Sequence, residues 1–283
     1  MHVGETGSGG VLPLRPMTVG ELLDAALALL RTRARALLGL GLLLAAVEQA
    51  VLYPVREWSH GYGLHSGRVE EWFVLIATGL GTEAVAIAIL GATAGAATVP
   101  AMFGRPVARP PRARSRAVAA VGVVALAAGL LTGIAALGLV LGWVFVYPLI
   151  GLAAPAVVID RVGPGRALLR SAGLVLRSGL RPGVIRLLGY VGWLMFRLAL
   201  ALGGVAALGL IPGFDAGPLA PLLGPLAWLL VNALAYPVLG CLDAVLHVEA
   251  RMRVEGFDIA AGRALRRGET LHPILAAPAR GAA

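Results

Sequence analysis

The chain contains little of what a soluble enzyme depends on. Charged residues make up only 14% of its 283 residues, hydrophobic residues make up 58%, and all 24 basic residues are Arg. The mean hydropathy of +0.85 is far above that of an ordinary globular domain, so a bilayer is the natural solvent for this sequence. The single cysteine, Cys241, excludes an intrachain disulfide. No Cys/His cluster is present, and we predict neither a metal site nor a cofactor.

The net charge of +9 predicts a negatively charged binding partner, but the sequence does not resemble that of a nucleic-acid-binding protein. Aromatic residues, which could stack on bases, are only 6% of the chain, and the Arg residues lie between apolar runs. Anionic lipid headgroups suit this placement better. We therefore expect membrane lipids as partners, and no nucleic acid.

Six apolar segments are long enough to cross a bilayer, which takes about 20 residues for roughly 30 Å of hydrocarbon. The stretch 117–159 is uncharged and too long for one span, so it predicts a hairpin that turns near Gly138 to Gly142. The predicted spans are 36–55, 72–100, 117–138, 140–159, 187–211 and 219–246. The predicted fold class is therefore all-α, a polytopic membrane helical bundle.

The Arg residues also predict the orientation of these spans. Before the first span, in alternate loops and after the last span lie 21 Arg, whereas the opposite loops hold only Arg56 and Arg68. Because cytoplasmic loops carry the excess of Arg, both termini are predicted to be cytoplasmic. The use of Arg alone, with abundant Ala, Gly and Leu, is typical of a GC-rich bacterial genome, so we expect a multi-pass protein of a bacterial plasma membrane. Residues 18–260 should form the membrane domain, between flexible segments 1–17 and 261–283.

Two amphipathic helices are predicted on the cytoplasmic face, over 19–35 and 164–181. The first begins at a capping box formed by Thr18 and Glu21, and Arg33 alone falls on its apolar side. In the second, four Arg lie within about 60° on the helical wheel, opposite the apolar side chains. These are Arg166, Arg170, Arg177 and Arg181. This face either docks an acidic lipid or partner, or simply anchors the helix to headgroups.

Charged residues deep inside apolar spans predict a buried polar cluster. Arg197 lies about 16 Å into the fifth span at 1.5 Å per residue, and Glu48 and Glu83 lie at a similar depth in the first and second. Asn232 is midway along the sixth. A lone charge at this depth costs about 3 kcal/mol, so we expect these residues to pair. This midplane cluster (Glu48, Glu83, Arg197 and Asn232) is either a structural clasp or a site where an unpaired Glu binds a proton or a cationic group.

Three motifs resemble those of a known family. They are RPMTVGELLDAA from residue 15, PAVVID followed by GPG, AL and RS over 155–171, and EARMRVEGFD over 249–258. All three are similar to motifs of the glycerophosphoryl diester phosphodiesterase membrane domain family, and they occur in the same order. The positions that match the first and third motifs are Glu21, Asp24, Arg251, Arg253, Glu255, Gly256 and Asp258. The resemblance implies a membrane domain without catalysis, because hydrolysis in the fused relatives belongs to a separate domain.

The third motif also predicts local structure. Its spacing permits helix pairs between Glu249 and Arg253 and between Arg251 and Glu255, with Gly256 ending the helix. Pairs of this kind contribute only about 0.3 kcal/mol each, which does not explain so marked a pattern. The motif either packs on the amino-terminal helix or on a cytosolic partner, or it is an ordinary capped helix end.

These observations favour a noncatalytic integral membrane protein, a scaffold or accessory subunit of a bacterial envelope or lipid-related system, with an unidentified protein partner. The alternative is a small transporter or permease subunit that uses the midplane cluster. An intramembrane enzyme would need a Ser/His, paired-Asp or His–metal set at one depth, and the sequence shows none.

Overall fold

The helices of this chain follow its apolar runs. The computed structural model describes residues 12–59, 69–104, 111–138, 141–211, 217, 220–269 and 274–275, and that part of the chain is all-α. The helices, in chain order, are α1 (Val19–Thr32), α2 (Ala34–Trp58), α3 (Val69–Phe103), α4 (Pro111–Leu137), α5 (Leu141–Ile150), α6 (Ala153–Ile159), α7 (Pro164–Arg177), α8 (Arg181–Leu208), α9 (Ala220–Glu255) and α10 (Phe257–Arg266).

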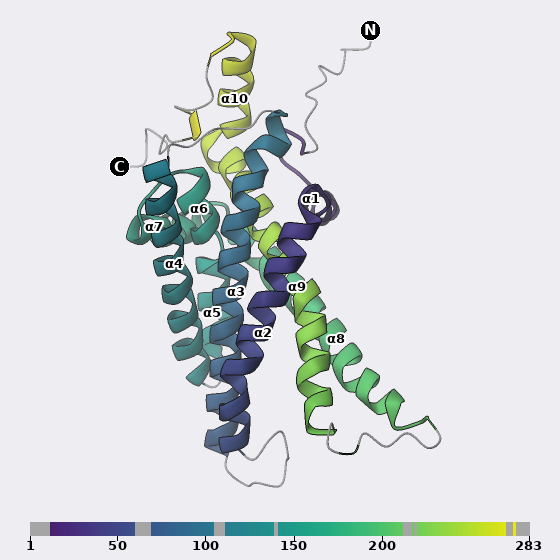
Figure 1. Ribbon diagram of the computed structural model, residues 1–283. Coiled ribbons are helices and arrows are strands. Elements are labelled where there is room, and N and C mark those ends of the chain that lie inside the picture. Colours follow the sequence, from purple (N-terminus) through teal and green to yellow (C-terminus); the bar gives the residue numbers. More distant parts are fainter. Residues whose placement is uncertain are drawn as a thin grey trace.

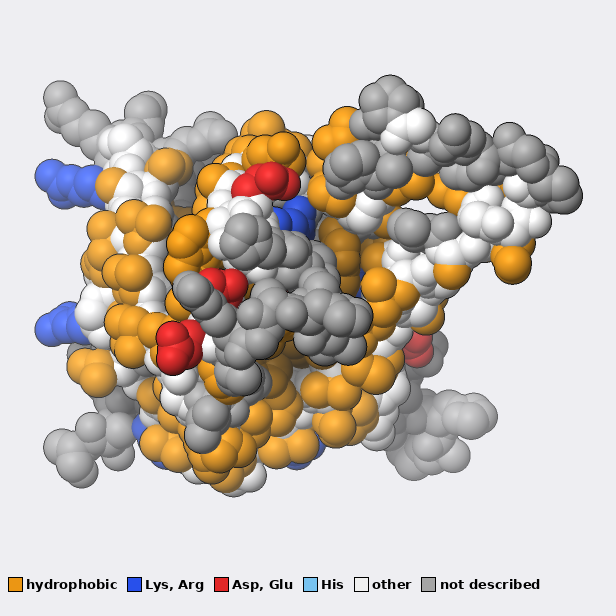
Figure 2. Space-filling model, turned by 90° about the horizontal axis from the view of Figure 1, so that it is seen from below, with side chains coloured by type: hydrophobic (Ala, Val, Ile, Leu, Met, Phe, Trp, Pro, Cys, Tyr) orange, Lys and Arg blue, Asp and Glu red, His pale blue; other side chains and the backbone are white. Residues whose placement is uncertain are grey.

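Six segments of the described chain are long and apolar enough to cross a membrane, which confirms the predicted polytopic bundle. They are Ala34–Trp58, Glu70–Phe103, Ser115–Leu137, Leu141–Ile159, Arg181–Leu208 and Leu222–Glu255. Large hydrophobic side chains are exposed along them, as expected for helices solvated by lipid. Seen from below, the molecule shows mainly hydrophobic side chains, with a few acidic and basic ones (Figure 2).

Helix α9 lies at the centre of the bundle and is the most buried of the six spans. It packs against α1, α2, α3 and α8. Its contact with α3 is close because two glycines meet there. A Cβ added at Gly240 would lie 2.8 Å from the backbone nitrogen of Gly91. Small residues at such a crossing let two helix backbones approach closely.

Helices α1, α7 and α10 gather at one end of the bundle, the upper end in Figure 1. We call this the Arg-rich end, because the segments predicted to be cytoplasmic meet there. Helix α1 begins at the predicted capping box, in which the Thr18 amide donates to Glu21 Oε2 at 2.7 Å and the Glu21 amide donates to Thr18 Oγ1 at 3.4 Å. The hydrogen bonds from Arg15 and from Thr18 lower the pKa of Glu21 to about 2.

The fourth span is broken, although the sequence predicted one helix over 140–159. Helix α5 ends at Ile150, and α6 begins at Ala153. The side chain of Arg186 fills the gap: a Cβ added at Gly151 would lie 1.9 Å from Arg186 Nε. Pro155, four residues after Gly151, also lacks the amide that would continue the helix. Arg186 also donates a hydrogen bond to the carbonyl of Tyr147, four residues before Gly151.

Some residues of the two terminal segments pack against the bundle or continue its helices. Residues 1–11 and 276–283 lie outside the described residues, but Leu12 and Met17 are buried, and the Leu12 amide donates to the carbonyl of Ala101 at 3.2 Å. At the other end, α10 continues to Arg266, past the limit of 260 that the sequence suggested. Arg56, which we placed in an external loop, lies in the last turn of α2 and is buried.

Candidate functional site

The structure brings all four residues of the midplane cluster together from four different spans. Arg197 Nη1 on α8 donates to Glu83 Oε1 on α3 at 2.6 Å and to Asn232 Oδ1 on α9 at 3.3 Å. Asn232 Nδ2 in turn donates to Glu48 Oε2 on α2 at 2.9 Å. Arg197 is 0% exposed and Glu48 is 3% exposed, so this is an interior site. The expected pairing is therefore present, and the cluster holds two carboxylates for one guanidinium.

Two tyrosines and a threonine complete this cluster, and sequence reasoning missed them. Tyr236 donates to Glu48 Oε2 at 2.7 Å, Thr82 donates to Glu48 Oε1 at 3.3 Å, and Tyr190 donates to Glu83. The helical spacing of the two tyrosines could have predicted their place in the cluster. Tyr236 follows Asn232 by four residues and Tyr190 precedes Arg197 by seven, so each shares a helix face with a residue already in the cluster.

A second buried ion pair lies next to the cluster. Arg186 forms a two-pronged pair with Asp243, Nε to Oδ1 at 2.6 Å and Nη2 to Oδ2 at 3.1 Å. Its guanidinium lies 3.5 Å from the ring centroid of Tyr147, whose ring is 5.0 Å from that of Tyr190. The guanidinium of Arg197 is 5.0 Å from the same Tyr190 ring. Arg186, which we had assigned to a cytoplasmic loop, is therefore buried and connected to the midplane cluster through aromatic rings.

Several buried donors beside this aromatic group have no hydrogen-bond acceptor among the described residues. They are Arg197 Nε and Nη2, Trp143 Nε1 and the hydroxyl of Tyr147. The rings of Trp143 and Tyr147 and the guanidinium of Arg197 all lie 5.0 Å from the ring of Tyr190, so these donors belong to side chains around one residue. Buried polar groups are nearly always hydrogen-bonded, which makes this region suited to a polar occupant.

A larger ion-pair network lies at the Arg-rich end, around Asp160, the residue that directly follows α6. Asp160 accepts hydrogen bonds from Arg251 Nη1 at 2.8 Å and from Arg170 Nε, and its carboxylate lies 3.1 Å from His247 Nε2. Burial alone would raise the pKa of Asp160. His247, Arg251 and Arg170 outweigh burial and hold that pKa well below its usual range.

Glu255 is the second carboxylate of this network. It accepts from Arg170 Nη2 at 2.8 Å and from Arg251 Nε at 2.9 Å, so each Arg joins both acids. The predicted helix pair of Arg251 and Glu255 is thereby confirmed. Gly256, which has the left-handed angle φ = +61°, ends α9 as predicted.

Glu249 forms the third part of the network and ties down the amino-terminal segment. It accepts from Arg181 Nη1 at 2.5 Å and from Arg253 Nε, the second predicted helix pair. Both Arg also donate to the carbonyl of Met17, at 2.9 and 3.2 Å. The EARMRVEGFD motif therefore packs on the start of the RPMTVGELLD segment, one of the two alternatives. We call this whole set the end network: Asp160, Arg170, Arg181, His247, Glu249, Arg251, Arg253 and Glu255.

The predicted Arg face of the second amphipathic helix is not a continuous free surface. Arg170 and Arg181 turn inward to the end network, whereas Arg166 and Arg177 are exposed. Leu169, on the apolar side of the predicted helical wheel, is 77% exposed. The helical wheel describes only the residues of one helix. It could not show that carboxylates of α9 lie nearby and attract Arg170 and Arg181. Of the other motif residues, Asp24 is exposed on α1 and Asp258 lies in the first turn of α10.

One face of α9 carries most of these interactions. Five of its polar residues are spaced by four, seven, four and four positions, which keeps them within an arc of about 100° of the helix. They are Asn232, Tyr236, Asp243, His247 and Arg251. This periodicity was the signal in the sequence for Asp243 and His247, two of the site residues that the prediction omitted.

The comparisons with known proteins leave the function to be argued from this geometry. No family, curated protein or solved structure matches the chain. The resemblance to the glycerophosphoryl diester phosphodiesterase membrane domain family stays a prediction that rests on its three motifs.

Proposed function

We propose that this multi-pass membrane protein is a noncatalytic scaffold or accessory subunit of a bacterial envelope or lipid-related system, and that it belongs with the membrane domain family that its motifs resemble. Its Arg-rich end would face the cytoplasm and hold a protein partner. The observation that carries the proposal is the end network, whose two ion-paired groups both lie on helix α9. One group joins α9 to the segment at Met17 and to the start of α8, and the other joins α9 to α7 and to Asp160.

The energetics of buried ion pairs support this role. Removing charges from water costs several kcal/mol per ion, and the attraction within the pairs roughly offsets that cost, so such a network adds little net stability. It does fix the relative positions of the segments that it joins, because each Arg needs both of its partners in place. A surface held in one shape is what a docking platform requires.

Helix α10 offers the surface for that partner. It follows Gly256 directly and extends past the rest of the bundle at the top of Figure 1. It buries Phe257, Ala261 and Ala264, yet Ile259 is 55% exposed and Leu265 is 41% exposed. Exposed Arg flank these two side chains, at positions 263, 266 and 267. An apolar strip bordered by Arg fits an amphipathic partner segment with acidic flanks.

Copurification from the native host tests this function. The tagged chain should retain a partner at a fixed ratio, and Ile259→Glu with Leu265→Glu should release it, since the two changes place acids on the proposed contact. The control is Arg31→Gln with Arg35→Gln, which alters one exposed residue in the last turn of α1 and one in the first turn of α2, at the same end. A wild-type chain recovered alone, or a partner retained equally by both variants, would contradict the scaffold.

The second candidate, a transporter subunit, has its own supporting observation in the unpartnered donors beside the midplane cluster and in the excess of carboxylates there. A hydrophobic carbodiimide, which modifies protonated carboxyl groups within membranes, discriminates between the two. Transport would be favoured if the reagent modifies Glu48, if the Glu48→Gln variant is not modified, and if a transported solute protects the wild type from modification. An unreactive cluster in a chain that retains its partner would favour the scaffold.

A further inference from the structure

A groove of about 530 Å³ lies between α3, α4 and the end of α6. Small and branched apolar side chains line most of it, among them Ala92, Ala96, Val118 and Val121. Along α3 it extends from Pro100 to Ile89, which is about 16 Å at 1.5 Å per residue. That is about half of the roughly 30 Å hydrocarbon core, the depth of one lipid leaflet.

Two arginines line this groove, and both belong to segments at the Arg-rich end. Arg33 lies at the junction of α1 and α2 and was the one residue of its helix on the wrong face of the wheel. It is exposed, and it makes no ion pair with any described residue. Its place in the groove accounts for a position that amphipathicity did not explain.

Arg161, the second arginine, is held in a strained backbone conformation. Its φ of +58° is in the left-handed region, which a residue with a side chain rarely adopts. It directly follows Asp160, which the end network fixes through three partners. Strain of this kind persists only where the surroundings enforce it, and it is found most often at functional sites. The end network thus holds the segment that carries Arg161 to the groove.

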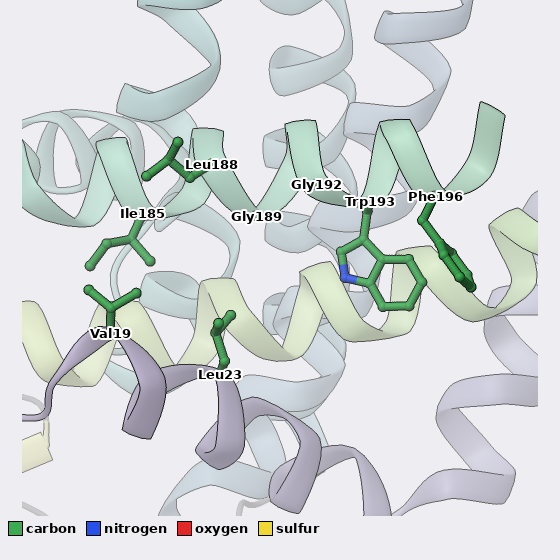
Figure 3. A pocket seen from close by; sticks show the side chains of 8 residues that line it. All are labelled: Val19, Leu23, Ile185, Leu188, Gly189, Gly192, Trp193 and Phe196. Carbon is green, nitrogen blue, oxygen red and sulfur yellow. The ribbon is translucent and has the colours of Figure 1, made fainter. Parts of the chain in front are cut away.

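A second groove, which has no arginine in its lining, serves as a comparison. A groove of about 400 Å³ lies between α1 and α8, where Val19 lies opposite Ile185, and Leu23 and Trp193 also line the groove (Figure 3). Its lining is wholly apolar, so acyl chains can cover it without any choice of headgroup. The groove of Arg33 and Arg161 joins an apolar wall to two cations at the headgroup level.

We propose that the groove between α3 and α4 binds an anionic phospholipid, with one acyl chain along the apolar wall and the phosphate at Arg33 and Arg161. Guanidinium groups bind phosphate through paired hydrogen bonds, and basic pockets between transmembrane helices select anionic headgroups. The lipid belongs to the leaflet at the Arg-rich end. This site goes beyond the proposed scaffold function and does not depend on a protein partner.

Lipid retention by the full-length chain tests the site. The purified protein is released from nanodiscs of equal parts phosphatidylglycerol and phosphatidylcholine, and the lipids that remain bound are counted by native mass spectrometry. Arg33→Gln with Arg161→Gln should reduce retained phosphatidylglycerol roughly tenfold. The matched control is Arg35→Gln with Arg166→Gln, two exposed Arg of the same end that do not line the groove. Equal losses in the two double variants would overturn the proposal.

Two further variants separate the groove from general charge effects. Ala96 is exposed within the groove, so Ala96→Phe should block the acyl chain, whereas Ala119→Phe on the neighbouring surface of α4 should not. Arg161→Gly should lose the lipid and unfold at a higher temperature, because glycine adopts the left-handed conformation without strain. This pair of results excludes misfolding as the cause.

A titration with inorganic phosphate identifies the source of the anion. Excess phosphate should leave phosphatidylglycerol bound, because it lacks the acyl chain. Displacement by phosphate alone would assign the site to a free anion and refute the lipid, as would an Ala96→Phe variant that retains as much lipid as the wild type.

Discussion

Replacing Arg197 with Met tests whether the midplane cluster is held together by its one cation. The methionine side chain has a similar length and no charge, so the change removes the pairs with Glu83 and Asn232 but fills most of the space. Glu83 then keeps only the hydrogen bond from Tyr190, and two carboxylates remain in the interior without a cation. The variant therefore isolates the electrostatic contribution of one side chain.

The expected loss follows from the burial of the pair. Arg197 is 0% exposed and the side chain of Glu83 is 13% exposed. Removing one partner of a buried ion pair costs about 3–5 kcal/mol, because the other charge stays uncompensated, whereas removing both partners is often nearly neutral. We expect Arg197→Met to lower the free energy of unfolding by about 4 kcal/mol and the double variant with Glu83→Gln to lower it by only about 1 kcal/mol.

Reversible unfolding in mixed micelles, with a rising fraction of dodecyl sulfate, gives these values. The five Trp of the chain supply the fluorescence signal. The single variant Glu83→Gln completes a double-mutant cycle, and its coupling energy with Arg197→Met should be 2 kcal/mol or more. Either an Arg197→Met variant as stable as the wild type or two changes that simply add would refute the pairing argument.

The remaining predictions concern the end network and the helix contacts. Asp160→Asn should cost roughly 3 kcal/mol, measured by the same unfolding assay, because it removes the carboxylate on which Arg170, Arg251 and His247 converge. The folded-state pKa of Asp160 lies below the unfolded value of about 3.9, so this stabilisation is complete above about pH 5 and decreases as the pH falls below 4. If the difference in unfolding free energy between the wild type and Asp160→Asn disappeared between pH 8 and pH 5, this explanation would be wrong. Gly240→Ala should lower stability by about 1–3 kcal/mol through its clash with Gly91, whereas Gly122→Ala, which meets nothing within 4 Å, should be neutral or slightly stabilising. Equal effects of the two changes would argue against the close α3 contact.

The sequence predicted the parts of this structure that depend on solvation. Apolar length determines the spans, and a charge inside a span has few ways to be stabilised other than meeting another polar group. This is why Glu48, Glu83, Arg197 and Asn232 could be grouped before any contact was known. The capping box of α1 and the helix pairs of the third motif were accessible for a different reason, since both depend on residues three or four positions apart.

The features that the sequence did not predict depend on contacts between distant segments. Arg170 and Arg181 turn inward because Glu255 and Glu249 lie near them, 85 and 68 positions later in the chain. The contact in the gap between α5 and α6 is of the same kind, because the side chain that fills it comes from α8. Helical periodicity relates the residues of one helix to each other, and it contains no information about which neighbour each face will meet.

The position of the polar face on α9 has a consequence for how the chain is made. Helix α9 is the last of the six spans to emerge during synthesis, and it provides Asn232 for Glu48, Asp243 for Arg186, and two acids for Arg170 and Arg181. Until it inserts, Glu48 and Arg186 lack these partners inside the bilayer, where an unpaired charge is costly, and Arg170 and Arg181 lack theirs at the Arg-rich end. Completion of the bundle is therefore a single late event, and a nascent chain stopped before residue 220 would present several unpaired charges to the quality-control proteases of the membrane.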